Sequence, residues 1–160
     1  MKATRTEIEK YLKSLEETPR SILNVTKGID DKLLQVKSDR NSWAMNDILA
    51  HLRSCADVWT YSIYAMLAEN ELVLPDINER KWAKVTGYAD VPFRTSLQAF
   101  TLQRENLLFV LKTLPFESWE KSAVIFERKH TIFTQVRRMA KHEKEHCEQM
   151  RSLLSRSTQR

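Results

Sequence analysis

Glycine and proline are both scarce in this chain of 160 residues, with two and four copies respectively. Folds rich in strands need many turns, and turns draw heavily on these two residues. Their scarcity therefore argues against sandwiches, barrels and repeated strand–helix–strand units. The sequence also lacks any apolar run near the roughly 18 residues that a membrane-spanning helix requires, so we expect no membrane partner.

Cysteine is scarce as well, and neither sign of charge dominates the chain. Cys55 and Cys147 can form at most one disulfide, and the charged N-terminus lacks the apolar stretch of a secretion signal. We therefore expect a cytoplasmic protein with free thiols. The net charge is +5, but lysines and arginines alternate with acidic residues, a pattern typical of a solvated surface. We expect no nucleic-acid partner.

Apolar residues recur with the spacing of a helix face in four segments of the chain. These segments are residues 6–25, 45–69, 95–113 and 131–154. Thr4 and Glu7 fit a capping box before the first segment, and Pro19 either kinks that helix or begins a second one. Gly28 is a suitable residue to end this helical stretch. The pattern predicts an all-α protein, a four-helix bundle forming a single domain over residues 1–160.

The connection between the second and third predicted helices, residues 70–94, is long for a compact domain. An extended chain covers about 3.3 Å per residue, and a bundle helix of about 20 residues is roughly 30 Å long, so this segment can run the full length of the bundle. We expect the third helix to lie parallel to the second, which gives an up-down-down-up bundle with a long crossover. The crossover contains Trp82 and Tyr88, so it is expected to pack against one side of the bundle.

Three of the four histidines lie on predicted helix faces. His142 and His146 are four residues apart and therefore neighbours on one surface, and His51 lies beside the apolar stripe of the second helix. The rise of about 1.5 Å per residue places the three rings at similar heights if the two helices are antiparallel. Three imidazoles can hold one divalent metal ion and leave positions open for water or substrate. The alternative is that they are hydrogen-bonded packing residues.

Residues 142–146 also match the H-E-x-x-H pattern of zinc metalloproteases. A protease is disfavoured, because Gln149 and Ser152 stand where the extended pattern has Gly and His, and no strand pattern supplies a substrate-binding edge. Glu143 remains the candidate catalytic residue, since it points into the apolar stripe of its helix. It can act as a base or orient an imidazole, and the alternative is a surface glutamate.

Two further residues have two possible roles each, and two more have a single expected position. Cys55 shares the face of His51 and is either a fourth metal ligand or a small buried apolar residue. Arg104 falls in an apolar stripe and either binds an anionic group of a substrate or is a surface arginine whose stem covers apolar area. His130 is expected in a loop, with Thr131 as the N-cap of the last helix.

Several stretches between about residues 18 and 150 together resemble the DinB-like (DinB/YfiT) superfamily of small metal-binding four-helix bundles. The most specific stretch is Arg138-Met-Ala-x-His142-Glu-x-x-His146-Cys-x-Gln149. The weaker ones are Ser42-Trp43, Asp47-Ile-Leu-Ala-His51, Leu74-Pro75, Trp82, Ser96-Leu97-x-x-Phe100, Arg104, Trp119 and His130-Thr-x-Phe133.

The resemblance implies an up-down-down-up bundle in which His51, His142 and His146 hold a divalent metal ion. Zinc or nickel is the usual metal in such sites, homodimers are frequent, and some relatives are transferases or isomerases that use a low-molecular-weight thiol. We therefore expect a metal-dependent transferase or hydrolase that acts on a small molecule. The alternative is a non-catalytic dimeric binding protein with a vestigial metal site. A third hypothesis, nucleic-acid binding through the cations among residues 137–144, is disfavoured by their acidic neighbours.

Overall fold

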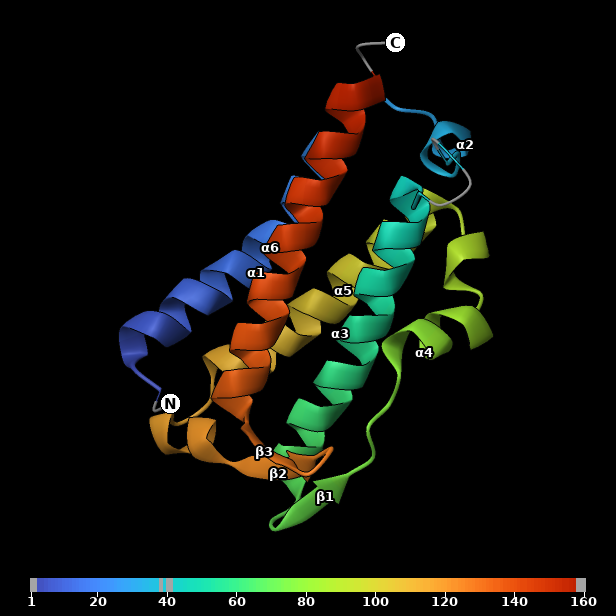
Figure 1. Cartoon of the computed structure of the whole chain (residues 1–160). Coiled ribbons are helices and arrows are strands. Elements are labelled where there is room, and N and C mark those ends of the chain that lie inside the picture. The colour runs from blue at the N-terminus through green and yellow to red at the C-terminus, as the bar shows by residue number, and fades with distance from the viewer. Residues whose placement is uncertain (1–2, 38, 40–41, 158–160) are drawn as a thin grey trace.

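Four long helices form a bundle in the computed structural model, which describes residues 3–37, 39 and 42–157 (Figure 1). These helices are α1 (Arg5–Val25), α3 (Met45–Ala68), α5 (Phe93–Lys112) and α6 (Ile132–Ser157). Shorter elements are α2 (Asp31–Leu34), α4 (Glu79–Val85) and the 3-10 turns η1 (Tyr88–Asp90) and η2 (Phe116–Glu120). The predicted helices begin and end within a few residues of the four long ones. The prediction of a mostly helical bundle is confirmed.

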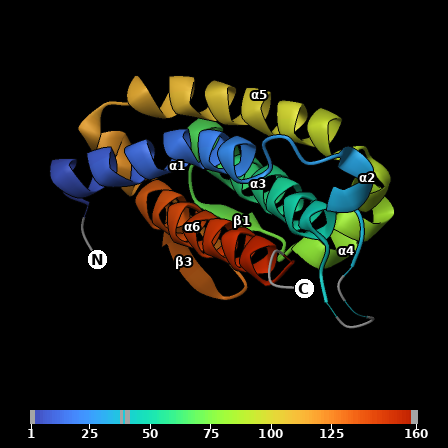
Figure 2. The same cartoon turned by 90° about the horizontal axis from the view of Figure 1, so that it is seen from above.

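Side-chain contacts set the directions of the long helices. His51 of α3 meets His142 of α6 and Trp59 lies under Arg138, so these two helices are antiparallel. Asp57 of α3 meets Gln103 of α5, and Figure 1 shows that these two helices run parallel. The view down the bundle shows α1 packed beside both α5 and α6 (Figure 2). Buried leucine, isoleucine and aromatic side chains fill the space between them, each contributing about 1.5–3 kcal/mol to folding.

The N-terminal segment forms one continuous helix through its proline. The Thr4 hydroxyl accepts a hydrogen bond from the Glu7 backbone at 3.3 Å, as the predicted capping box requires. Pro19 lies inside α1, so it does not begin a second helix, which decides between the two alternatives left open by the sequence. Gly28 follows the helix with φ +77°, in the left-handed region that favours glycine. None of the helices in the described part of the chain is long and apolar enough to cross a membrane.

A small sheet at the base of the bundle corrects the prediction of a purely helical chain. It contains β1 (Leu72–Leu74), β2 (Ser122–Ile125) and β3 (Arg128–Thr131), in that order. β1 pairs parallel to β2, and β2 pairs with β3 as a hairpin in which Ala123 faces His130. His130 therefore lies in a strand and not in the predicted loop. The hairpin turns at Phe126 and Glu127, both at positive φ without a glycine, so the usual sequence signal for such a turn is missing.

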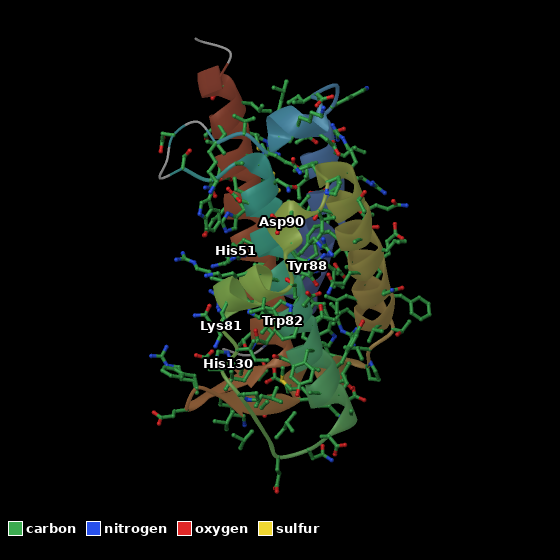
Figure 3. All side chains as sticks on the ribbon, turned by 90° about the vertical axis from the view of Figure 1, so that its right-hand side faces the viewer. His51, Lys81, Trp82, Tyr88, Asp90 and His130 are labelled. Atoms are coloured by element: carbon green, nitrogen blue, oxygen red, sulfur yellow. The ribbon has the colours of Figure 1, made fainter. Side chains whose placement is uncertain are left out.

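The carboxylate of Asp57 is one of the groups that hold the crossover against α3. Asp57 accepts hydrogen bonds from the indole of Trp82 at 3.1 Å, the hydroxyl of Tyr88 at 2.6 Å and the amide of Gln103 at 2.7 Å. The first two donors belong to the crossover and the third to α5. The expected packing of the crossover on one side of the bundle is confirmed. As a result, α4 lies along α3, on the face where Figure 3 shows His51.

Candidate metal centre

Local capping fixes the start of both helices that carry the histidines. The Asp47 carboxylate accepts a hydrogen bond from the Ala44 backbone at 2.9 Å, one turn before His51. At the start of α6, the hydroxyl of Thr131 accepts from the Thr134 backbone at 3.1 Å, which confirms Thr131 as the predicted N-cap. The antiparallel packing of α3 on α6 then brings the inward faces of the two helices together.

The three predicted histidines converge at the interface of α3 and α6. The Nε2 atom of His142 lies 3.1 Å from Nε2 of His51 and 3.1 Å from Nε2 of His146. One nitrogen from each ring can be chosen so that all three lie within 4.8 Å of one another. All three side chains are partly buried, so the cluster is neither sealed in the core nor fully exposed.

The donor set fits a divalent metal ion. Two nitrogens bound to one tetrahedral zinc ion at about 2.0–2.1 Å are about 3.3–3.4 Å apart, close to the observed separations. Hydrogen bonds among the rings alone cannot satisfy all three nitrogens well. The Nε2 atom of His142 faces the Nε2 atoms of both His51 and His146, and a neutral imidazole has only one N–H. In addition, Nδ1 of His142 is buried without a hydrogen-bond partner among the described residues.

The histidines are held in the form that binds metals. Burial, with a smaller contribution from the charge of His146, lowers the pKa of His51 to about 4 and that of His142 to about 3. Both rings are therefore neutral near pH 7. Nδ1 of His146 lies 2.7 Å from Oε1 of Gln149, and donation from this nitrogen leaves the lone pair of Nε2 directed at the other rings. The sequence alone assigns no role to Gln149. Its role in orienting the ring of His146 follows from this contact.

Two tryptophans form the walls of the centre. The ring of Trp43 stacks on His146 at 6.0 Å between centroids and meets His51 edge-on at 5.3 Å. Trp59 meets His142 edge-on at 5.1 Å. These walls remove water from one side of each imidazole and contribute to the burial that lowers the pKa values of His51 and His142. Trp59 lies two turns after His51 on the same helix stripe. This interval alone could have predicted that Trp59 lines the histidine centre.

Residues at the start of α4 cover Trp59. The indole of Trp59 donates to a carboxylate oxygen of Glu79 at 2.8 Å, and Arg138 of α6 pairs with the same oxygen at 3.3 Å. The guanidinium of Arg138 also stacks on Trp59, with Cζ 4.3 Å from the ring centroid. Figure 3 shows His51 beside α4, on the same face of the molecule as Lys81 and Trp82. No local pattern predicts this network, because its members are far apart along the chain.

Glu143 and Arg104 lie on the other side of α6. Each side chain is only 2% exposed, and the two form an ion pair between α6 and α5. Arg104 also donates to the sulfur of Met139. Arg104 is therefore neither a surface arginine nor open to an anionic substrate. The carboxylate of Glu143 meets Arg104 and Thr18 rather than a histidine, so these contacts give no support to its predicted catalytic role.

Both cysteines are buried thiols. Sγ of Cys55 lies 3.6 Å from Nε2 and 3.7 Å from Nδ1 of His51, which places the sulfur beside the ring. Cys55 does not belong to the group whose ligand atoms lie within 4.8 Å of one another. Burial raises its pKa and also raises that of Cys147, to about 11. These observations favour the interpretation of Cys55 as a small packing residue over that of a fourth ligand.

The fold and the site together define a helical bundle with a candidate three-histidine metal centre. The sequence profile of the DinB superfamily matches residues 14–150, and the chain belongs to this superfamily. The chain is 25% identical over 108 residues to a protein of Halalkalibacterium halodurans named "Putative metal-dependent hydrolase BH0277". That match covers 68% of this chain and 63% of the relative, so less than two thirds of the relative's length is spanned.

A solved structure shares the fold. YfiT from Bacillus subtilis, described as "a probable metal-dependent hydrolase with an unusual four-helix bundle topology", superposes with a TM-score of 0.81. The alignment covers 98% of this chain and 90% of YfiT, with 17% sequence identity. At this identity the likeness establishes the bundle fold alone.

Proposed function

We propose that this protein binds a divalent metal ion, zinc or nickel, through His51, His142 and His146 and uses it to hydrolyse a small molecule. The observation that carries the proposal is the convergence of three Nε2 atoms at the interface of α3 and α6, two of them on rings whose pKa values are lowered by burial. The descriptions of BH0277 and YfiT as metal-dependent hydrolases support the reaction class. The predicted up-down-down-up order makes α3 antiparallel to α6, which is the arrangement that this site requires.

The residues of the chain have separate tasks in this proposal. A bound divalent ion supplies Lewis acidity toward a water molecule or a substrate oxygen. The three imidazoles hold the ion and leave at least one position open. Gln149 holds the ring of His146 in the tautomer that presents Nε2. Trp43 and Trp59 exclude bulk water from the walls of the site, which strengthens electrostatic interactions within it.

The family resemblance supports finer expectations that belong to the same proposal. A low-molecular-weight thiol can take the place of water at the same centre, which makes an S-transferase the second form of the activity. We also expect a homodimer in the cytoplasm. The competing hypothesis is a non-catalytic binding protein with a vestigial metal site, and one experiment separates it from an enzyme.

The test is an activity assay on protein purified without a histidine tag and loaded with zinc or nickel. Model esters, amides and phosphate esters are offered with water alone, and electrophiles are offered with a low-molecular-weight thiol. We expect turnover that requires the metal, disappears in His142→Ala and persists in His130→Ala, a matched loss of a histidine outside the trio. Stoichiometric metal without turnover in any arm would favour the binding protein, and turnover that survives His142→Ala would overturn the proposed centre.

A further inference from the structure

Two guanidinium groups flank the three-histidine centre, each stacked on one of its tryptophans. Cζ of Arg138 lies 4.3 Å from the ring centroid of Trp59, and Cζ of Arg80 lies 5.9 Å from that of Trp43. Both distances are within the range of cation–π attraction. Trp59 in turn contacts His142, and Trp43 contacts His51. The candidate metal centre therefore lies between two arginine–tryptophan pairs.

The two arginines differ in what neutralises them. Arg138 pairs with Glu79, and the same carboxylate oxygen accepts the hydrogen bond of the Trp59 indole. Arg80 is exposed, and no ion pair links it to another side chain in the described part of the chain. One positive charge thus remains uncompensated beside the centre.

Two arginine charges also act on this face at His130. Burial and then the charges of Arg138 and Arg128 lower the pKa of His130, which Figure 3 places on the same face as His51. Glu79, the acid that meets Trp59, is already engaged by Arg138. A negatively charged molecule that approaches this face therefore meets a field that favours it.

We propose that Arg80 binds an oxyanion group, a carboxylate or a phosphate, of the small molecule that reacts at the three-histidine centre. A guanidinium presents parallel N–H donors that match either oxyanion, and its flat face can remain on the indole of Trp43 while its edge donates. The inference rests on the proposed function, because it concerns the substrate of that centre. It names the substrate class as small anions and assigns Arg80 as a positioning residue.

The test measures binding of three probes of similar shape by calorimetry. Benzoate and phenyl phosphate carry the two candidate oxyanions, and benzamide is the neutral counterpart. Each is titrated into the zinc-loaded full chain as wild type, Arg80→Gln, Arg80→Lys and Arg5→Gln. Arg5 is the matched control, because its guanidinium also stacks on an aromatic ring, that of Phe116, at 5.0 Å. Zinc content is measured in every preparation.

We expect wild type to bind one or both anions about tenfold more tightly than benzamide. This is the difference in affinity that one charge-assisted hydrogen-bonded pair supplies. Arg80→Gln loses most of this preference, Arg80→Lys keeps part of it, and Arg5→Gln keeps all of it. Zinc content stays at the wild-type level in all four proteins. The anion that shows the larger loss in Arg80→Gln identifies the oxyanion as a carboxylate or a phosphate.

Four results would overturn the inference. They are an unchanged preference in Arg80→Gln, an equal loss in Arg5→Gln, the absence of any preference in wild type, and the absence of measurable binding. In each of these cases stoichiometric zinc would leave the proposed metal centre intact. If none of the four proteins binds zinc, the proposed function fails and the inference fails with it.

Discussion

His142 and Glu143 are neighbours on α6, yet they belong to two different kinds of site. His142 faces α3, where partly buried neutral imidazoles meet under two tryptophans. Glu143 faces α5, where it forms a fully buried ion pair with Arg104. Successive residues of a helix point about 100° apart, so one turn of α6 supplies both faces. The first face has partial access to solvent, and the second is closed to it.

The comparison teaches that an H-E-x-x-H spacing does not by itself give the glutamate a part in the chemistry. A buried ion pair gains little over an apolar pair of the same size, but removing one partner leaves an uncompensated charge in the core. A cluster of histidines instead holds its donors ready for a cation. The ion pair of Glu143 and Arg104 should therefore govern stability, and the histidine cluster should govern metal binding. The following predictions are ordered from the largest expected effect to the smallest.

Replacing Glu143 with alanine should give the largest loss of stability. The variant leaves Arg104 buried without its partner, and we expect the free energy of unfolding to fall by about 3–5 kcal/mol in urea denaturation. The folded fraction should still bind one zinc ion. The double variant Arg104→Met with Glu143→Leu should recover most of the stability. A double variant that folds well but has lost zinc would show that Glu143 belongs to the metal centre after all.

Replacing Gln149 with alanine should affect only the histidine side of the comparison. The change removes the acceptor of the Nδ1–H group of His146, and we expect zinc affinity to fall about 10–100-fold in a chelator competition. Thermal unfolding of the metal-free protein should be nearly unchanged. Ser152→Ala, on the same helix, is the control and should keep wild-type affinity. Equal zinc affinity in Gln149→Ala and wild type would remove the orienting role assigned to this contact.

Acidification should weaken the metal-free protein through the histidines. The folded-state pKa values of His51 and His142 are about 4 and 3, below the unfolded value of 6.5, so the unfolded chain binds more protons between these limits. The free energy of unfolding should therefore be level above pH 6.5 and fall as pH decreases toward 4. Both rings are partly exposed, so solvent screening keeps the effect modest. His142→Asn should show a shallower decline, and an identical decline would exclude this histidine as its source.

The helices and the histidine trio could be predicted from the sequence because both follow from regular spacing. The apolar period fixed the long helices, and the four-residue interval of His142 and His146 required a shared face. The position of Glu143 could not be derived in the same way. Periodicity shows that a residue lies on a buried stripe, but α6 packs against both α3 and α5, and only tertiary packing decides which neighbour a given residue meets.

The sheet and the network over Trp59 escaped prediction for other reasons. Strands of three or four residues are too short to show alternation, and the turn at Phe126 and Glu127 lacks the glycine that usually marks it. The network joins Trp59, Glu79 and Arg138, which lie in three separate elements. A long crossover indicated that something covers the bundle, but its contacts depend on how α4 packs against α3.

The most direct test of the metal centre is a crystal structure of the zinc-loaded protein with anomalous diffraction data recorded at the zinc edge. We predict one anomalous peak between α3 and α6, at about 2.0–2.1 Å from Nε2 of each of His51, His142 and His146. A peak elsewhere in the molecule, or three imidazoles that face one another with no peak between them, would contradict the account.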